Sequence, residues 1–381
     1  MEIAQEKIMS KIVISSNTCW SIFNFRLELA RFFEKSHQVE IIAPKDLYSD
    51  KLRDMGFIVH EIDMASSSIA PFQDIATLLA YWKLLNKIKP DYYFGFTAKP
   101  NIYGGFIAGL IGCKVINNIA GLGRTFSRSG LLQSVMQLLY RIGLSQSQHV
   151  FFQNKDDLTL FLESGLLNNI HYSVLPGSGV DINRFTCKQT IPRDARDSAS
   201  PSFVFLFSAR LLLEKGIREY ISAASQLKAI YPHCTFQVLG KHGGTAAELP
   251  KVELDEACRN GTIEYLGTTD NVVAVLHNAD CFILPSYYRE GVPRSLLEAG
   301  SCGLPLITTD SVGCRETVID GVNGYLISPR SSVALFDAMK KIVELDMRER
   351  HEMGLASRNY MVNNFSEALV LARYQHVLLE S

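Results

Sequence analysis

Several features that mark common protein classes are missing from this sequence. No uninterrupted apolar run reaches about 18 residues, so no segment is predicted to span a membrane. The polar, acidic first residues do not resemble a secretion signal, and MSKIVISS, from Met9, is predicted to be the natural chain start. The eight cysteines are scattered without a C-x-x-C pair, which favours a reducing compartment without disulfides or a zinc site. A formal net charge of −1 argues against a general nucleic-acid binder.

The motifs of several enzyme chemistries are missing as well. The chain has no G-x-S-x-G esterase elbow and no P-loop. It also lacks a G-x-G-x-x-G motif after its first strand-like run, which weakens a nicotinamide-cofactor interpretation. No D-x-D occurs, and the nine histidines show no metal-ligand spacing. No motif therefore requires a metal or a cofactor, and we expect neither.

The apolar residues that are present alternate between short strand-like runs and longer helix-like runs. Strands are predicted at residues 11–15, 39–43, 57–62, 92–96, 114–119, 150–153, 203–207, 235–239, 262–266, 281–284, 306–308 and 325–327. Helices are predicted at residues 25–33, 75–88, 133–142, 217–230, 294–300, 332–345 and 366–379. This alternation is typical of α/β proteins, in which helices cover both faces of a parallel sheet.

A polar segment with two prolines, residues 186–202, interrupts this alternation and is predicted to be a linker or exposed loop. We therefore expect two doubly wound, Rossmann-like α/β domains, residues 1–186 and 187–363, facing across a cleft. The sequence does not decide which domain residues 364–381 pack on, and a return to the first domain is one option. Ligands favour such domain interfaces and the carboxyl ends of the strands.

The segment YYREGVPRSLLE, residues 287–298, carries two carboxylates, Glu290 and Glu298. It follows an apolar strand and runs into the helix predicted from Arg294. The free N–H groups of a helix start suit a phosphate or a sugar oxygen. Glu290 is predicted to lie in the loop, free to reach a ligand, and Glu298 on the first turns of the helix, facing the same cleft. The alternative is a helix cap with a solvated face.

Two cations lie after the strand predicted at residues 203–207. Arg210 follows the strand and Lys215 opens the next helix, so together they could clamp a diphosphate, with a planar fork and a point charge. The alternative is a pair of surface cations on a loop. In the first half of the chain, Ser16 and Asn17 follow the first strand, where backbone amides could meet a phosphate.

The stretch between Asp91 and Asp156 contains no acidic residue. Its basic residues are Lys99, Lys114, Arg124, Arg128, Arg141 and Lys155. Residues 131–144 within it, LLQSVMQLLYRIGL, are apolar on most faces. A basic amphipathic segment of this kind can lie on an anionic membrane surface. The alternative is a core helix of the first domain beside a basic rim of the active site.

Long blocks of the chain resemble the retaining glycosyltransferases of family four, which have the GT-B fold. The blocks that carry the likeness are SARLLLEKG (208–216), ADCFILPSYYREGVPRSLLEAGSCGLPLITTD (279–310), GCRETVIDGVNGYLI (313–327), LPGSGVDINRF (175–185) and GLGRTF (121–126). The likeness covers nearly the whole chain. It implies a hexosyltransferase that uses a UDP-sugar, retains the configuration of the donor sugar and needs no metal.

The resemblance also implies roles for individual residues. Arg210 and Lys215 would neutralise the donor diphosphate, Glu290 would contact the donor sugar near its reacting face, and Glu298 would bind the ribose hydroxyls. The donor-binding candidates are Ser16, Asn17, Arg210, Lys215, Leu266, Glu290, Gly291, Val292 and Glu298, and the catalytic candidates among them are Arg210, Lys215 and Glu290. Many relatives carry a histidine in the loop that here reads NNIAG, residues 117–121, so no general base is assigned.

Within the family, TAKPNIYGG and SYYREGVPRSLLEAGSCG resemble enzymes that extend undecaprenyl-diphosphate-linked glycans. This likeness implies a lipid-linked saccharide acceptor, a donor such as UDP-N-acetylgalactosamine, a role in surface polysaccharide or glycoprotein glycan assembly, and peripheral association with the inner face of the cell membrane. Lys99, Arg124 and Arg128 are candidates to meet the acceptor diphosphate and the lipid headgroups. The alternatives are a nucleotide-sugar epimerase of the same fold and a non-catalytic nucleotide-sugar-binding module.

Overall fold

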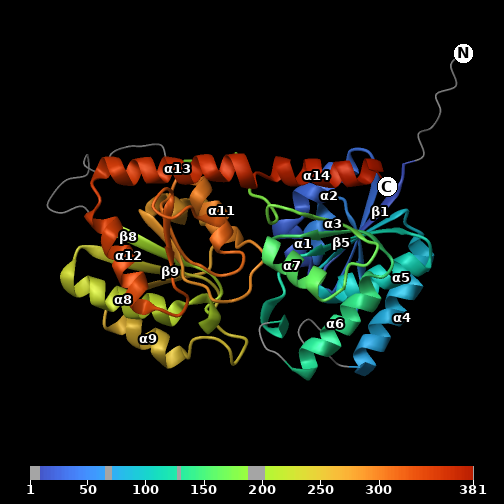
Figure 1. Ribbon diagram of the computed structural model, residues 1–381, viewed down its shortest axis with the longest axis horizontal. Coiled ribbons are helices and arrows are strands. Elements are labelled where there is room, and N and C mark those ends of the chain that lie inside the picture. Colours follow the sequence, from blue (N-terminus) through green and yellow to red (C-terminus); the bar gives the residue numbers. More distant parts are fainter. Residues whose placement is uncertain (1–8, 65–70, 127–129, 188–201, 381) are drawn as a thin grey trace, which may run out of the picture. The chain divides into compact units, whose positions relative to one another are not determined.

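A computed structural model describes residues 9–64, 71–126, 130–187 and 202–380 of the chain (Figure 1). The chain divides into two compact units. Unit 1 comprises the chain up to Ser178 together with the segment from Val370 onward, and unit 2 runs from Gly179 to Leu369. The division thus falls between Ser178 and Gly179 rather than after residue 186, and the last helix contributes to unit 1 from Val370.

Unit 1 is built on a parallel sheet of seven strands in the order β3-β2-β1-β4-β5-β6-β7. The strands are β1 (Lys11–Ser15), β2 (Gln38–Ala43), β3 (Ile58–Glu61), β4 (Tyr92–Phe96), β5 (Lys114–Ile119), β6 (Ser147–Phe152) and β7 (His171–Val174). The central strands are apolar on both sides because helices cover both faces of the sheet. The sequence did not predict β7, a half-exposed edge strand (HYSV) without an apolar run.

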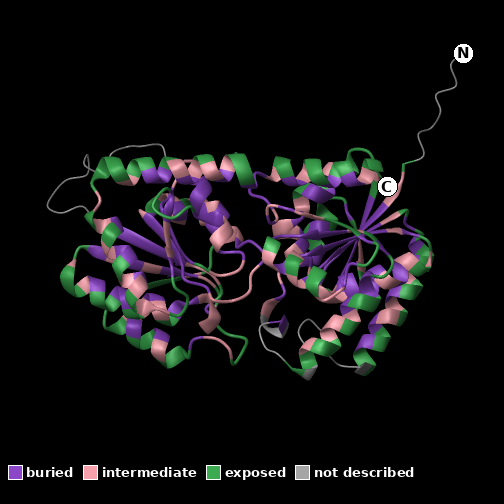
Figure 2. Cartoon of the chain, in the orientation of Figure 1, coloured by how far each residue is buried: buried purple, intermediate pink, exposed green. Residues whose placement is uncertain are grey.

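The helices of unit 1 pack on these two faces (Figure 2). They are α1 (Cys19–Phe25), α2 (Leu27–Glu34), α3 (Ser49–Asp54), α4 (Pro71–Ile88), η1 (Pro100–Gly104), α5 (Gly105–Leu110), η2 (Gly123–Phe126), α6 (Leu131–Leu144) and α7 (Lys155–Glu163). The helix predicted at residues 25–33 corresponds to α2, and the sequence did not predict α1 before it. The two helices meet at Arg26, whose backbone leaves the helical region with φ −134° and ψ 4°. The buried Arg26 guanidinium lies 4.6 Å from the centre of the Phe96 ring, which anchors this break.

Unit 2 is built on a parallel sheet of six strands in the order β10-β9-β8-β11-β12-β13. The strands are β8 (Phe203–Ser208), β9 (Cys234–Leu239), β10 (Glu264–Gly267), β11 (Cys281–Leu284), β12 (Leu306–Thr309) and β13 (Gly324–Ile327). The helices are η4 (Leu213–Lys215), α8 (Ile217–Ile230), α9 (Lys251–Arg259), α10 (Val272–Asn278), α11 (Arg294–Ser301), η5 (Arg315–Thr317), α12 (Ser332–Glu344) and α13 (Met347–Phe365). All six strands occur where the sequence predicts them, so the two Rossmann-like sheets are confirmed.

The last helix, α14, runs from Glu367 to Glu380 and supplies core residues to unit 1. Val370, Tyr374 and Val377 are buried in the cluster that covers one face of the seven-stranded sheet. The Asn118 side-chain amide donates a hydrogen bond of 2.7 Å to the Tyr374 hydroxyl. The C-terminal segment is therefore part of the structure of unit 1.

Candidate active site

The predicted donor residues of unit 2 gather where its strand order reverses. β8 pairs with β11 on one side and with β9 on the other, so the connections on the two sides of β8 leave in opposite directions. Parallel sheets bind ligands outside the carboxyl ends of the strands at such a point. Arg210 and Lys215 follow β8, and Glu290 follows β11. The structure thus brings together residues that lie far apart in the sequence.

Lys215 and Glu290 form an ion pair at this edge. The Lys215 ammonium donates a hydrogen bond to Glu290 Oε1, and the two side chains are only 13% and 12% exposed. Ser286 Oγ lies 3.0 Å from the same carboxylate oxygen, and the ammonium lies 5.4 Å from the centre of the Tyr288 ring. Glu290 lies in the loop, as predicted, but its carboxylate is not free, because it is bonded to Lys215 and Ser286.

The other predicted cation, Arg210, has a different environment. Its side chain is exposed, and no hydrogen bond or ion pair of its guanidinium occurs with any residue that the structure describes. Arg210 belongs to a segment held by backbone bonds, since Leu211 N–H donates 3.2 Å to the Lys241 carbonyl. The edge of unit 2 thus offers one cation that is already paired and one whose fork is open to an anionic ligand.

Two glycines allow the loops of this edge to approach each other closely. Gly216 has a φ of +81°, and a Cβ there would lie 2.2 Å from the Pro285 carbonyl oxygen. Gly313 also has a φ of +81°, and a Cβ there would lie 1.7 Å from the carbonyl oxygen of Gly291. Any side chain at either position would push the loops apart. These contacts hold the helix start after Lys215 against β11, and the loop after β12 against Gly291.

The loop after β11 is tied to its neighbour by hydroxyl groups. Thr309 Oγ1 and Ser311 Oγ both donate to the Ser286 carbonyl, Ser311 at 2.8 Å. Ser286 Oγ in turn lies 3.2 Å from the Glu214 carbonyl. The backbone N–H groups of Tyr287 and Tyr288 also donate to that carbonyl, at 2.9 and 3.2 Å. Three groups of the loop after β11 thus contact the Glu214 carbonyl, directly before Lys215, which favours a preformed site.

Glu298 lies in the second turn of α11 and is bonded to an arginine of the same helix. Arg294 Nε donates 3.1 Å to Glu298 Oε1, and its Nη2 donates 3.4 Å to Glu367. The three side chains are 14–18% exposed. Burial raises the pKa of Glu298, while Arg294, and to a smaller extent Arg184, act to lower it. Glu298 is thus a mostly buried carboxyl whose ionisation depends on Arg294.

The remaining candidates of unit 2 differ in their distance from this pair. Gly291 and Val292 are buried directly after Glu290 and before α11. Leu266 is 39% exposed on the edge strand β10, which β9 separates from β8. The structure therefore groups Gly291 and Val292 with Glu290. Leu266, on β10, lies two strands away from β8, the strand that Arg210 follows.

The predicted donor residues of unit 1 follow β1. Ser16 is fully buried, and its hydroxyl has no hydrogen-bond partner among the described residues. Asn17 N–H donates 3.2 Å to Thr97 Oγ1, which follows β4. Thr97 has a φ of +72°, which is strained for a β-branched residue and typical of functional positions. The sequence drew attention to this loop but gave no sign of its backbone strain.

Lys99, a candidate for the acceptor diphosphate, is also engaged. Its ammonium lies 2.7 Å from Asp74 Oδ1, and the two side chains are 14% and 9% exposed. Asp74 belongs to α4, outside the acid-free stretch of the sequence. The Lys99 charge is thus paired within the unit, and its role at the acceptor diphosphate and the lipid headgroups stays a prediction. The side chain of Arg124 and the whole of Arg128 lie outside the described residues.

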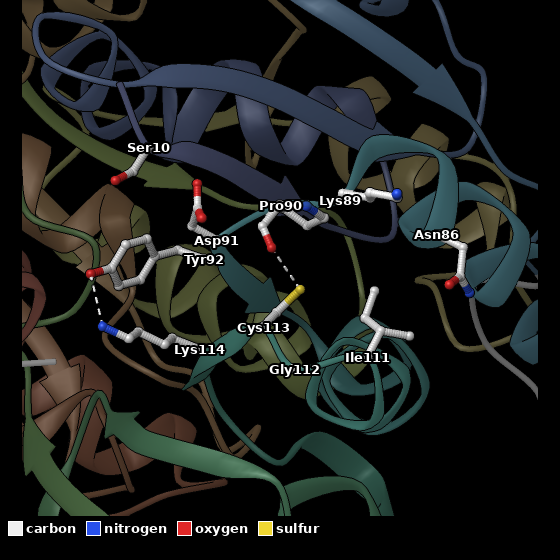
Figure 3. Close-up of a pocket in the computed structure, with 10 residues that line it drawn as sticks. All are labelled: Ser10, Asn86, Lys89, Pro90, Asp91, Tyr92, Ile111, Gly112, Cys113 and Lys114. Carbon is white, nitrogen blue, oxygen red and sulfur yellow. Dashed lines mark hydrogen bonds between the residues drawn. The ribbon is translucent and has the colours of Figure 1, made fainter. Parts of the chain in front are cut away.

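A cavity of about 420 Å³ opens at the opposite, amino-terminal edge of the unit 1 sheet (Figure 3). The Cys113 thiol in it donates 2.9 Å to the Pro90 carbonyl, and Asp91 accepts 2.7 Å from the Lys11 N–H. Burial raises the pKa of Cys113 to about 11, so this thiol is a poor nucleophile. The cavity holds none of the predicted site residues.

Two family models match most of the chain. Residues 189–360 match the family model described as "Glycosyl transferases group 1", and residues 11–154 match "Glycosyl transferase 4-like". The chain is 26% identical over 339 residues to the N,N'-diacetylbacillosaminyl-diphospho-undecaprenol alpha-1,3-N-acetylgalactosaminyltransferase of Campylobacter jejuni, covering 85% of this chain and 87% of that protein. It is 24% identical to the UDP-Gal:alpha-D-GlcNAc-diphosphoundecaprenol alpha-1,3-galactosyltransferase of Escherichia coli, covering 78% of each.

Solved structures show the same fold. The glycosyltransferase of Rickettsia africae superposes with a TM-score of 0.78 at 18% identity, covering 98% of both chains. The HepE protein of Anabaena, in complex with UDP, superposes with a TM-score of 0.78 at 16% identity, covering 98% of this chain and 100% of that one.

Proposed function

The chain belongs to the family-four glycosyltransferases of the GT-B fold, and we propose that it moves N-acetylgalactosamine or a related hexose from a UDP-sugar to a polyprenyl-diphosphate-linked saccharide. The chain is a hexosyltransferase, as its relatives are. The observation that carries the donor proposal is the Lys215–Glu290 ion pair at the strand-order reversal of unit 2, where Arg210 also follows β8. Similarity to the Campylobacter jejuni enzyme over 85% of the chain supports the acceptor class.

Arg210 and Lys215 neutralise the donor diphosphate in this proposal. An ammonium has three donors, so Lys215 can keep its bond to Glu290 while it donates to a phosphate oxygen. The exposed Arg210 fork supplies a second, planar contact. Cations placed where a leaving group gains negative charge lower the barrier, and two of them take the place of a bound metal ion. We therefore propose transfer without a metal cofactor.

Glu290 and Glu298 have different tasks. Glu290 is held by Lys215 and Ser286 and contacts the donor sugar near its reacting carbon. Glu298 accepts hydrogen bonds from the ribose hydroxyls of the nucleotide. As the bond from the sugar carbon to the phosphate oxygen breaks, the acceptor oxygen forms the new bond on the same face and its proton passes to the departing phosphate. The configuration of the sugar is retained.

The proposed acceptor also places the enzyme at the inner face of the cell membrane. No helix of the described residues is both long enough and apolar enough to cross a bilayer. The acid-free, basic stretch between Asp91 and Asp156 supports attraction to anionic headgroups. We propose that unit 1 meets the acceptor and the membrane surface, and that unit 2 holds the UDP-sugar.

A radiolabel transfer assay tests this function. The purified full chain is incubated with a panel of UDP-sugars, with and without a short polyprenyl-diphosphate-linked N-acetylhexosamine, in the presence of EDTA. Label that moves into the lipid fraction supports a metal-independent transferase and identifies the donor. UDP-sugar binding without transfer from any donor would instead favour the epimerase or the binding module, and conversion of the free UDP-sugar separates those two.

A further inference from the structure

Exposed apolar side chains of unit 1 are concentrated on α4. Phe72, Ile75, Leu79 and Trp82 are 90%, 56%, 65% and 48% exposed. Their spacing of three and four residues places them on one face of the helix. The opposite face, with the fully buried Tyr81, Leu85 and its neighbours, already covers the sheet. The outer stripe therefore does not belong to the core of unit 1.

A second stripe of the same kind lies on α6. Leu132, Val135, Leu138 and Ile142 are 56%, 37%, 55% and 46% exposed. They are again three or four residues apart, while Tyr140 and Leu144 are buried against the sheet. The sequence presented residues 131–144 as either a membrane-binding helix or a core helix. The structure shows a helix with one apolar face in the core and a second apolar face outside it.

The two stripes belong to one helical layer. Both α4 and α6 pack against η1 and α5, on the same face of the seven-stranded sheet (Figure 1). Each follows a parallel strand, so both helices begin at the carboxyl edge of the sheet. Both stripes also change character along the helix. Each stripe is apolar from the start of its helix. The later turns carry exposed basic residues as well, Lys83 and Lys87 on α4 and Arg141 on α6.

The charges of this layer have a single sign on the outside. Asp74 is the only acidic residue of α4, α5 and α6, and it is buried on Lys99. Outside these three helices, the neighbouring exposed carboxylates are Asp63 before α4, Asp91 before β4 and Glu163 at the end of α7. An apolar face bordered by lysine and arginine matches an anionic lipid surface, where basic side chains reach the headgroups and tryptophan lies at the interface.

We infer that α4 and α6 together form a docking surface that inserts into the headgroup and acyl boundary of an anionic phospholipid bilayer. This inference rests on the proposed function and gives its membrane partner a defined surface. The apolar stripes supply the insertion, and Lys83, Lys87 and Arg141 supply the attraction. The start of each helix, at the carboxyl edge, lies deepest, and Trp82 marks the interface. The carboxyl edge of unit 1 is thereby held next to the headgroups.

Vesicle sedimentation tests the inference without any acceptor. The full chain is mixed with phosphatidylglycerol and phosphatidylethanolamine vesicles at low and high salt, and a Leu79→Asp/Leu138→Asp variant is compared with it. We expect the variant to lose at least about tenfold in vesicle partitioning, because two apolar anchors are replaced by charges. A Leu47→Asp/Leu379→Asp variant is the control, since these leucines are 89% and 80% exposed in unit 1 but lie off the layer.

Trp82 provides an independent readout. The chain has two tryptophans, so Trp20→Phe leaves Trp82 as the only indole. Its emission is expected to shift to the blue on vesicle binding and to be quenched by lipids brominated along the acyl chain. An unshifted Trp82, equal partitioning of the Leu79/Leu138 variant and the control, or loss of all binding at high salt would overturn insertion. Concentration-dependent dimers of the wild type that the double variant abolishes would show instead that a second copy covers this face.

The same variants separate this inference from the proposed function. Transfer to a short, water-soluble acceptor should remain within about twofold in the Leu79→Asp/Leu138→Asp variant, because neither leucine is part of the donor site. Transfer to acceptor embedded in vesicles should fall with binding. Absence of transfer by the wild type to every acceptor would contradict the proposed function and leave the vesicle result to decide the docking surface.

Discussion

The two units share a parallel, doubly wound sheet but carry different chemistry at the carboxyl edge. In unit 2 the edge is charged, with Arg210, Lys215 and Glu290 in the loops after β8 and β11. In unit 1 the corresponding loops after β1 and β4 present neutral Ser16, Asn17 and Thr97. The ion pair of Lys99 with Asp74 in unit 1 is mostly buried. The same topology therefore carries charged side chains at this edge of unit 2 and neutral ones at this edge of unit 1.

The outer faces of the helices also differ between the two units, in how charged and how apolar they are. Helices of unit 2 carry exposed ion pairs such as Arg218 with Glu253 at 2.6 Å and Arg348 with Glu352 at 2.8 Å. Such pairs are typical of a face that stays in water. The α4 and α6 faces of unit 1 expose apolar stripes. Exposed ion pairs thus occur on outer helices of unit 2, whereas the outer faces of α4 and α6 in unit 1 are apolar.

The largest expected effect comes from removing the charge of the unit 2 edge. Each of Arg210→Ala and Lys215→Ala should lower kcat/KM by about 10²–10³-fold, and the double variant should abolish detectable transfer, because the diphosphate stays under-neutralised. Arg218→Ala is the control, since this exposed arginine of α8 pairs with Glu253. Near-normal transfer by the double variant, shown folded by circular dichroism, would remove the basis of the comparison.

Substitutions of Glu290 and Glu298 should affect different kinetic constants. Glu290→Gln keeps a hydrogen-bond acceptor for Lys215 but removes the charge beside the donor sugar, so kcat should fall by roughly 10²-fold or more. Glu298→Ala should mainly raise the KM for the donor, by about tenfold, as expected for a residue that binds the ribose equally before and during reaction. Steady-state kinetics with varied donor measure both. Equal, modest losses in kcat for the two variants contradict the assigned roles.

The close loop contact at Gly313 should affect stability more than chemistry. A Cβ there would meet the Gly291 carbonyl oxygen at 1.7 Å in a backbone with positive φ, so Gly313→Ala should cost at least about 1 kcal/mol of unfolding free energy. Thermal denaturation measures this loss. Gly321→Ala is the matched control, because Gly321 has a φ of +74° with open space around it. Similar losses in both variants would assign the effect to backbone strain alone.

The ionisation of Glu298 gives a smaller effect that depends on pH. Burial raises the pKa of Glu298, so this carboxylate becomes protonated at a higher pH than an ordinary glutamate. As pH falls, donor affinity should therefore begin to weaken while an ordinary glutamate would still be ionised. Arg294→Met removes the main group that lowers this pKa, and the acid limb should move to higher pH. Because the folded pKa is raised, ionisation of Glu298 costs stability as pH rises through it. Titration of UDP binding by calorimetry shows the shift, and an unchanged acid limb in Arg294→Met counts against it.

The smallest expected effect is on the neutral edge of unit 1. Asn17→Ala leaves the backbone N–H that donates to Thr97 in place, so donor KM should change by less than about threefold. Direct comparison with Arg210→Ala under the same conditions measures the contrast between the two edges. A loss as large as that of Arg210→Ala would show that unit 1 contributes more than backbone groups to donor binding.

Local patterns in the sequence determined much of this protein. The apolar runs predicted all six strands of unit 2 and all but β7 of unit 1, because buried parallel strands are continuously apolar and β7 is a half-exposed edge. Residues such as Arg210 and Glu290 were identified because strand ends can be located in a sequence, and strand ends in α/β sheets bind ligands. The family resemblance supplied their roles, which these local patterns do not contain.

Only the tertiary structure decided how these residues are partnered. Lys215 meets Glu290 because β8 and β11 are neighbours, and Lys99 meets Asp74 because α4 packs against η1, which follows Lys99. Neither pairing follows from distance along the chain. Helix periodicity showed α4 to be rich in apolar residues, but it did not separate Tyr81 and Leu85 from Phe72 and Leu79. That separation depends on which face of the helix the sheet covers, and sheet contacts form between segments remote in sequence.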